Sequence, residues 1–125
     1  MLDVITIFDY DIRHMDQPNK ALTREILLSL WKIHILHHAA EGPIHGQWIT
    51  KELRRHGYDI SPGTLYPLLN RLERLGWLMR LKGEPKGLKA RKSYRLTARG
   101  RKVLDHVRGQ VRELHEEVVC EPKRR

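Results

Sequence analysis

The sequence predicts a mainly α-helical fold with one small β-hairpin, and three observations support that prediction. Leucines recur at helical spacing in the stretch SPGTLYPLLNRLERLGW, residues 61–77. The segments WLMRLK and KSYRL flank a loop that contains glycine and proline, as two short antiparallel strands would. Apolar residues then repeat at alternating intervals of three and four positions over residues 104–118, which indicates one more helix.

Two helices are expected before the leucine-rich one. The first spans residues 21–40 and the second, shorter one spans residues 46–55, because both carry apolar residues along one side. Between them, Gly42 suits the end of a helix and Pro43 cannot continue one. The predicted apolar positions are Ile26, Leu27, Leu30, Trp31, Ile33 and Leu36 in the first helix and Trp48, Ile49 and Leu53 in the second.

The third helix begins with residues that are poor inside a helix but suited to its first turn. Ser61 is a favoured N-cap, and Pro62 fits the first helical position because its missing N–H is not needed there. Gly76 ends the helix, and the residues expected to face the core are Leu65, Leu68, Leu69, Leu72 and Leu75. The N-terminal end of the helix thus carries small and polar residues that we expect to be exposed, as in a helix whose first turns enter a groove.

A last helix is expected over residues 98–119, with Thr97 as its cap. Its apolar residues form a heptad seam, made of Leu104, Val107, Val111, Leu114 and Val118. So narrow a stripe suits packing against one other helix better than packing against a broad core. We therefore predict that this helix joins two copies of the chain, and packing onto its own domain is the alternative.

The basic charge is concentrated in one segment. The 125 residues carry a formal net charge of +9. Residues 80–102 hold ten basic residues and one acidic residue, so this segment carries +9 while the rest of the chain balances. Solvated surfaces usually mix the two signs, so we expect the segment to contact a polyanion.

Three helices followed by a β-hairpin is the order of a winged helix-turn-helix, in which the third helix reads DNA and the hairpin loop is the wing. The sequence thus predicts a winged helix-turn-helix plus a C-terminal dimerisation helix. The candidate DNA-binding residues are Ser61, Gly63, Thr64, Tyr66, Asn70 and Arg71 on the third helix and Lys86, Lys89, Arg91 and Lys92 in or beside the wing. The expected parts of the chain are an N-terminal arm (1–19), a DNA-binding domain (20–97), a dimerisation helix (98–119) and a basic tail (120–125).

Three stretches of the chain occur in order: EGPIHG, SPGTLYPLLNRLERLGW and ARKSYRLTARGRKVL. Together they resemble the PadR family of transcriptional regulators, and the resemblance covers about residues 25–108. The single C-terminal helix is similar to that of the short subfamily. The resemblance implies a homodimer that represses transcription at palindromic operators in double-stranded DNA and is released by a small hydrophobic or aromatic effector. Short members tend to offer an aromatic side chain on the last helix to a flat ligand. This helix has none, so Trp31 would have to substitute for it.

Other function classes stay open at this point. The same fold would serve a non-specific or architectural nucleic-acid-binding protein, or a module that binds another protein. An enzyme is not expected, because the sequence shows no glycine-rich phosphate loop, no motif of paired carboxylates and no nucleophile elbow. No cofactor is expected either.

The histidines of the first helix raise the alternative of a metal-sensing repressor. His34 and His38 are one helical turn apart, a spacing that can bind a metal ion. Too few acidic or cysteine residues lie near them in the sequence, so we predict ordinary helix residues and no metal site. The single cysteine, Cys120, is predicted to lie on the surface without a role. One cysteine, no long apolar run and no signal-peptide pattern indicate a reducing, cytoplasmic setting.

Overall fold

The computed structural model describes residues 18–81 and 92–120. The chain divides into two compact units, Met1–Trp31 and Lys32–Arg125. Most of the expected N-terminal arm, most of the expected wing loop and the expected tail after Cys120 lie outside the described residues. The four-part division of the chain therefore stays a prediction.

In the first unit, the described residues are helical throughout. Helix α2 (Pro18–Leu22) continues into a π-helical turn, η1 (Thr23–Leu27), and then into α3 (Leu28–Glu41), which extends into the second unit. The sequence predicted one helix over residues 21–40 and missed the π-helical turn, because such turns are rare and have no composition of their own. Ile26 and Leu30, two of the predicted apolar positions, are 54% and 37% exposed.

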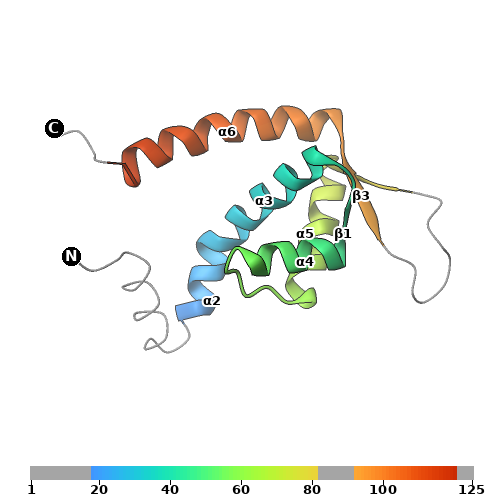
Figure 1. The fold of residues 1–125 in the computed structure, drawn as a ribbon, viewed down its shortest axis with the longest axis horizontal. Coiled ribbons are helices and arrows are strands. Elements are labelled where there is room, and N and C mark those ends of the chain that lie inside the picture. The colour runs from blue at the N-terminus through green and yellow to red at the C-terminus, as the bar shows by residue number, and fades with distance from the viewer. Residues whose placement is uncertain (1–17, 82–91, 121–125) are drawn as a thin grey trace. The chain divides into compact units, whose positions relative to one another are not determined.

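Two helices of the second unit match the predicted ranges. Helix α4 spans Gly46–Arg55, as predicted, and α5 spans Pro62–Arg74 inside the predicted stretch (Figure 1). The predicted apolar stripe of α4 is wrong at Trp48, whose side chain is 44% exposed. The core is made of aliphatic side chains from α3, α4, α5 and the sheet, chiefly Ile35, Leu36, Ile49, Leu53, Leu65, Leu69, Leu72 and Leu78.

The sheet has three antiparallel strands, in the order β1-β3-β2. They are β1 (Ile44–His45), β2 (Leu78–Arg80) and β3 (Ser93–Leu96). Strands β2 and β3 form the predicted hairpin, with Leu78 opposite Leu96. The pairing places Arg80, the first residue of the basic segment, opposite Tyr94.

Strand β1 was not predicted, since EGPIHG was interpreted only as the end of a helix. A strand of two residues is too short to show an alternating pattern. Its pairing becomes visible only in three dimensions, where Ile44 is buried opposite Tyr94. His45 Nδ1 also lies 2.6 Å from the hydroxyl of Ser93, so a side-chain hydrogen bond adds to the pairing of β1 with β3.

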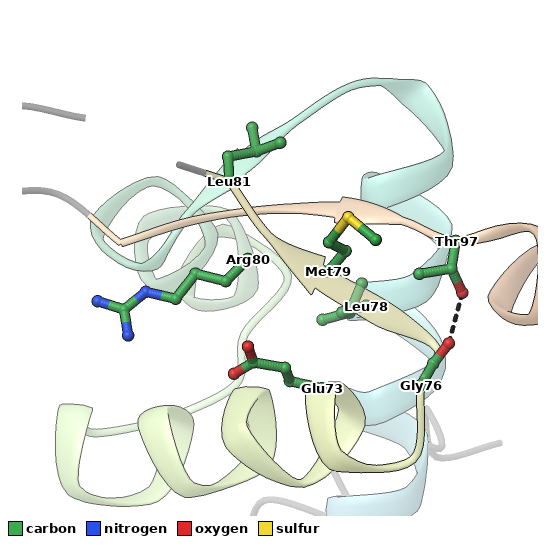
Figure 2. A pocket seen from close by; sticks show the side chains of 7 residues that line it. All are labelled: Glu73, Gly76, Leu78, Met79, Arg80, Leu81 and Thr97. Carbon is green, nitrogen blue, oxygen red and sulfur yellow. Dashed lines mark hydrogen bonds between the residues drawn. The ribbon is translucent and has the colours of Figure 1, made fainter. Parts of the chain in front are cut away.

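Helix α6 (Ala98–Val118) begins at the predicted cap. The backbone N–H of Gly100 donates a hydrogen bond of 2.9 Å to Thr97 Oγ1, and that hydroxyl donates one of 2.6 Å to the carbonyl of Gly76 (Figure 2). Gly76 ends α5 with a φ of +81°, which favours glycine. Thr97 thus fixes the start of α6 against the end of α5.

Candidate nucleic-acid interface

The N-terminal turn of α5 is exposed, as the sequence predicted. Ser61 and Gly63 are exposed and Thr64 is half-buried. Ser61 occupies the N-cap position, but its side chain accepts no hydrogen bond from the helix backbone. Its hydroxyl instead lies 3.4 Å from that of Thr64. The first turn therefore presents two adjacent hydroxyls rather than a side-chain cap.

The rest of α5 has one buried and one exposed side. Leu65, Leu68, Leu69 and Leu72 are buried. Asn70 and Arg71, two of the predicted DNA contacts, are exposed on the other side together with Arg74. An amide and two guanidinium groups are side chains that form paired hydrogen bonds to base edges and phosphates.

Tyr66 connects three elements. Its side chain is half-buried and packs over Gly46 at the start of α4, where an added Cβ would lie 2.5 Å from the Tyr66 hydroxyl. Lys92 directly precedes β3, and its Nζ lies 5.7 Å from the centroid of the Tyr66 ring, within the range of a cation–π contact. The sequence predicted Tyr66 as a DNA contact, and the structure gives this side chain a packing role as well.

The described part of the basic segment is exposed. Its cations lie on β2, beside and on β3, and in the first turns of α6, at Arg80, Lys92, Arg95, Arg99, Arg101 and Lys102. In residues 18–81 and 92–120, none of these six has a carboxylate within ion-pair distance. Lys86, Lys89 and Arg91, the predicted wing contacts, lie outside the described residues.

A pocket of about 740 Å³ lies between the end of α5 and β2. Figure 2 shows the side chains of Glu73 and Arg80 extending toward the same open space, beside Leu78 and Met79. The hydroxyl of Thr97 at its edge is already hydrogen-bonded to Gly76. The pocket therefore combines one carboxylate and one guanidinium with an apolar floor, and it holds no nucleophile paired with a base.

Three histidines come together next to α3. The structure places His56, from the turn after α4, beside His34 and His38 of α3. The ring of His34 is half-buried and its Nε2 lies 2.9 Å from the Tyr58 hydroxyl. Burial lowers the pKa of His34, and the neighbouring His56 and His38 lower it further. Sequence spacing alone did not indicate His56 or Tyr58.

The predicted heptad seam on α6 is covered only at its start. Leu104 is fully buried and Val107 is half-buried. Val111, Leu114 and Val118 are 41%, 53% and 67% exposed. The described residues of one chain therefore leave the C-terminal half of the seam open.

These features define a class of protein. Helices α3, α4 and α5, followed by a hairpin whose strands carry exposed cations, are the arrangement of a winged helix-turn-helix DNA-binding protein, here extended by a long C-terminal helix.

Comparison with known proteins identifies the family. The family model described as "Transcriptional regulator PadR-like family" matches residues 35–106. The transcriptional regulator Rv3488 of Mycobacterium tuberculosis is 48% identical over 96 residues, which cover 77% of this chain and 89% of that protein. The chain belongs to the PadR-like family of transcriptional regulators.

Solved structures agree with this assignment. A PadR-like transcription factor from Bacteroides fragilis matches with a TM-score of 0.68 and 26% identity, over 78% of this chain and 95% of that one. A PadR family transcriptional regulator from Eggerthella lenta matches with a TM-score of 0.62 and 32% identity, over 82% of this chain and 94% of that one. Across the described ranges, no helix has the length and apolar character needed to cross a membrane.

Proposed function

We propose that this chain is a homodimeric transcriptional repressor that binds a palindromic operator in double-stranded DNA and leaves it when a small hydrophobic effector binds. In this proposal α5 enters the major groove and the basic segment around the wing contacts phosphates. The chain acts in the cytoplasm by binding alone, without a catalytic step or a catalytic cofactor.

The contact between Lys92 and Tyr66 is the observation that carries the DNA-binding part. It places Lys92, a cation of the basic segment, over Tyr66 of α5, the helix that offers Asn70 and Arg71. Phosphate contacts from such cations fix the position of a protein on DNA, while side chains on a helix in the groove read bases. Both kinds of contact are available here from neighbouring elements.

The open half of the α6 seam supports the dimer. Val111, Leu114 and Val118 expose apolar surface at heptad spacing, and a second α6 would cover it. Two copies related by a two-fold axis would present two α5 helices, which suits a palindromic operator.

An effector that releases DNA would fit best at the contact between the two α6 helices. The seam supplies valine and leucine side chains but no aromatic ring. Trp31, considered as a substitute, is only 3% exposed in the single chain. We therefore expect a ligand held by aliphatic contacts rather than by ring stacking.

A titration with two DNA fragments tests this function. The protein is titrated against the DNA upstream of its own gene and against a scrambled fragment of equal length, at about 50 and 200 mM salt. We expect the upstream fragment to bind at least about a thousandfold more tightly, the lower end for specific over non-specific binding. Equal affinity for both fragments would contradict the repressor and would favour an architectural protein.

A double variant in the same titration tests the interface. Lys92→Ala with Arg95→Ala should weaken binding to both fragments and make the slope of log K against log salt shallower by about 1.8, or about 0.9 for each lost phosphate contact. Arg112→Ala, which removes an exposed cation from α6 away from the seam, is the matched control and should leave the slope unchanged. An unchanged slope in the double variant would place the DNA elsewhere.

A further inference from the structure

Three imidazole rings from two separate segments converge beside α3. His34 and His38 lie one turn apart on α3, and His56 lies in the turn between α4 and α5. One ring nitrogen from each of the three lies within 4.8 Å of the other two. Two nitrogens bound to one tetrahedral Zn²⁺ are about 3.4 Å apart, because each Zn–N bond is about 2.0–2.1 Å long. Small rotations of these side chains would therefore bring all three nitrogens to one ion.

His38 is oriented as a metal ligand would be. Its side chain is 9% exposed, and its Nδ1 lies 2.9 Å from Oε1 of Glu41. Because a carboxylate accepts, Nδ1 carries a proton, and in the neutral imidazole this leaves the lone pair on Nε2. Nε2 is buried, and no hydrogen-bond partner for it exists among the described residues. Histidines that bind metal usually donate their other N–H to a carboxylate in this way.

His34 and His56 complete the arrangement. Their ring centroids are 5.1 Å apart. His56 is exposed, so an ion can reach the cluster from solvent.

We propose that His34, His38 and His56 bind one divalent transition-metal ion, with water as the fourth ligand. Three imidazoles without a thiolate favour Zn²⁺, Co²⁺, Ni²⁺ or Cu²⁺ over Mg²⁺ and Ca²⁺, and Zn²⁺ suits a tetrahedral site best. The ion fastens the turn between α4 and α5 to α3, and α5 starts shortly after that turn. This site goes beyond the proposed repressor function and does not depend on it.

A second group of side chains competes for the same ion. His37, His38 and Glu41 also offer ligand atoms within 4.8 Å of one another. That group is weaker, because its use of Glu41 as a ligand would compete with the hydrogen bond that orients His38. His37 and Glu41 are also exposed. His37 is therefore the matched control for His56.

Calorimetric titration of the untagged full chain with ZnCl₂ tests the site. We expect one ion per chain, a loss of affinity of at least about a hundredfold in His56→Ala, and a change within about twofold in His37→Ala. His56 is exposed, so His56→Ala should keep the circular dichroism and melting temperature of the metal-free parent. An absence of Zn²⁺ binding by the parent would overturn the proposal, as would loss of binding in His37→Ala with retention in His56→Ala.

Trp48 provides a second measurement. Its ring lies edge-on to His38, with centroids 5.5 Å apart. Paramagnetic Co²⁺ at the site should quench the fluorescence of Trp48, with no such quenching in Trp48→Phe or His56→Ala. Glu41→Gln should weaken Co²⁺ binding by about tenfold, because Glu41 orients His38 without binding the ion. Quenching in His56→Ala equal to that in the parent would contradict the site.

Discussion

Gly46 and Gly100 stand where any side chain would collide with the rest of the chain. A Cβ on Gly100 would lie 2.1 Å from the carbonyl oxygen of Trp77, and one on Gly46 would lie 2.5 Å from the hydroxyl of Tyr66. Both glycines belong to stretches on which the family resemblance rests, EGPIHG and LTARG. Close packing therefore explains why Gly46 stands in the first stretch and Gly100 in the second.

Gly100→Ala should destabilise the chain. The carbonyl of Trp77 is backbone and cannot rotate away, so we expect a loss of about 1–3 kcal/mol in the free energy of unfolding, as in other overpacked sites. Urea denaturation followed by circular dichroism measures this loss.

Gly109→Ala is the matched control on the same helix. Nothing lies within 4 Å of a Cβ there, so alanine should stabilise α6 by up to about 1 kcal/mol. Equal stabilities of the two variants would contradict the steric role of Gly100.

Single residues differ in how far the sequence reveals their roles. Thr97 was predicted as a cap and is one, because that role depends only on its local position. Ser61 is at the predicted cap position, yet its hydroxyl turns to Thr64. The packing role of Tyr66 and the place of His56 depend on contacts between distant segments, and no local pattern indicates them.

At the scale of elements, the long periodic helices and the hairpin were predictable, and the two-residue strand was not. Helix α4 has the predicted bounds, and α6 ends one residue before its predicted end. Strand β1 was missed, because two residues show no period and its pairing depends on β3. The excess of positive charge in residues 80–102 could be counted from the sequence, but the contact of Lys92 with Tyr66 could not be predicted from it.

Val111→Asp should separate the proposed dimer. Two copies of this variant would bury two carboxylates in an apolar seam, so we expect the dimer dissociation constant to rise by at least about a hundredfold. Sedimentation equilibrium measures it. His106→Asp adds the same charge at an exposed position off the seam and should leave the dimer intact. A dimer of parental strength in Val111→Asp would show that α6 does not hold it.

At the scale of the whole protein, the family, the basic segment and the proposed dimer all bear on how DNA is bound. A single winged helix-turn-helix has one α5 and reads one half-site. Pairing of two chains through α6 would double the number of contacts with DNA, and it would favour DNA whose two half-sites are related by two-fold symmetry. The central claim is therefore that two copies, joined through α6, read two half-sites.

Footprinting of the DNA upstream of its own gene tests that claim most directly. We expect two protected half-sites, related by two-fold symmetry and spaced by about 10 base pairs or a multiple of that. Val111→Asp should lose this protection at concentrations where His106→Asp keeps it. Protection of a single half-site, or a symmetric footprint that survives in monomeric Val111→Asp, would show that pairing through α6 does not set how the DNA is bound.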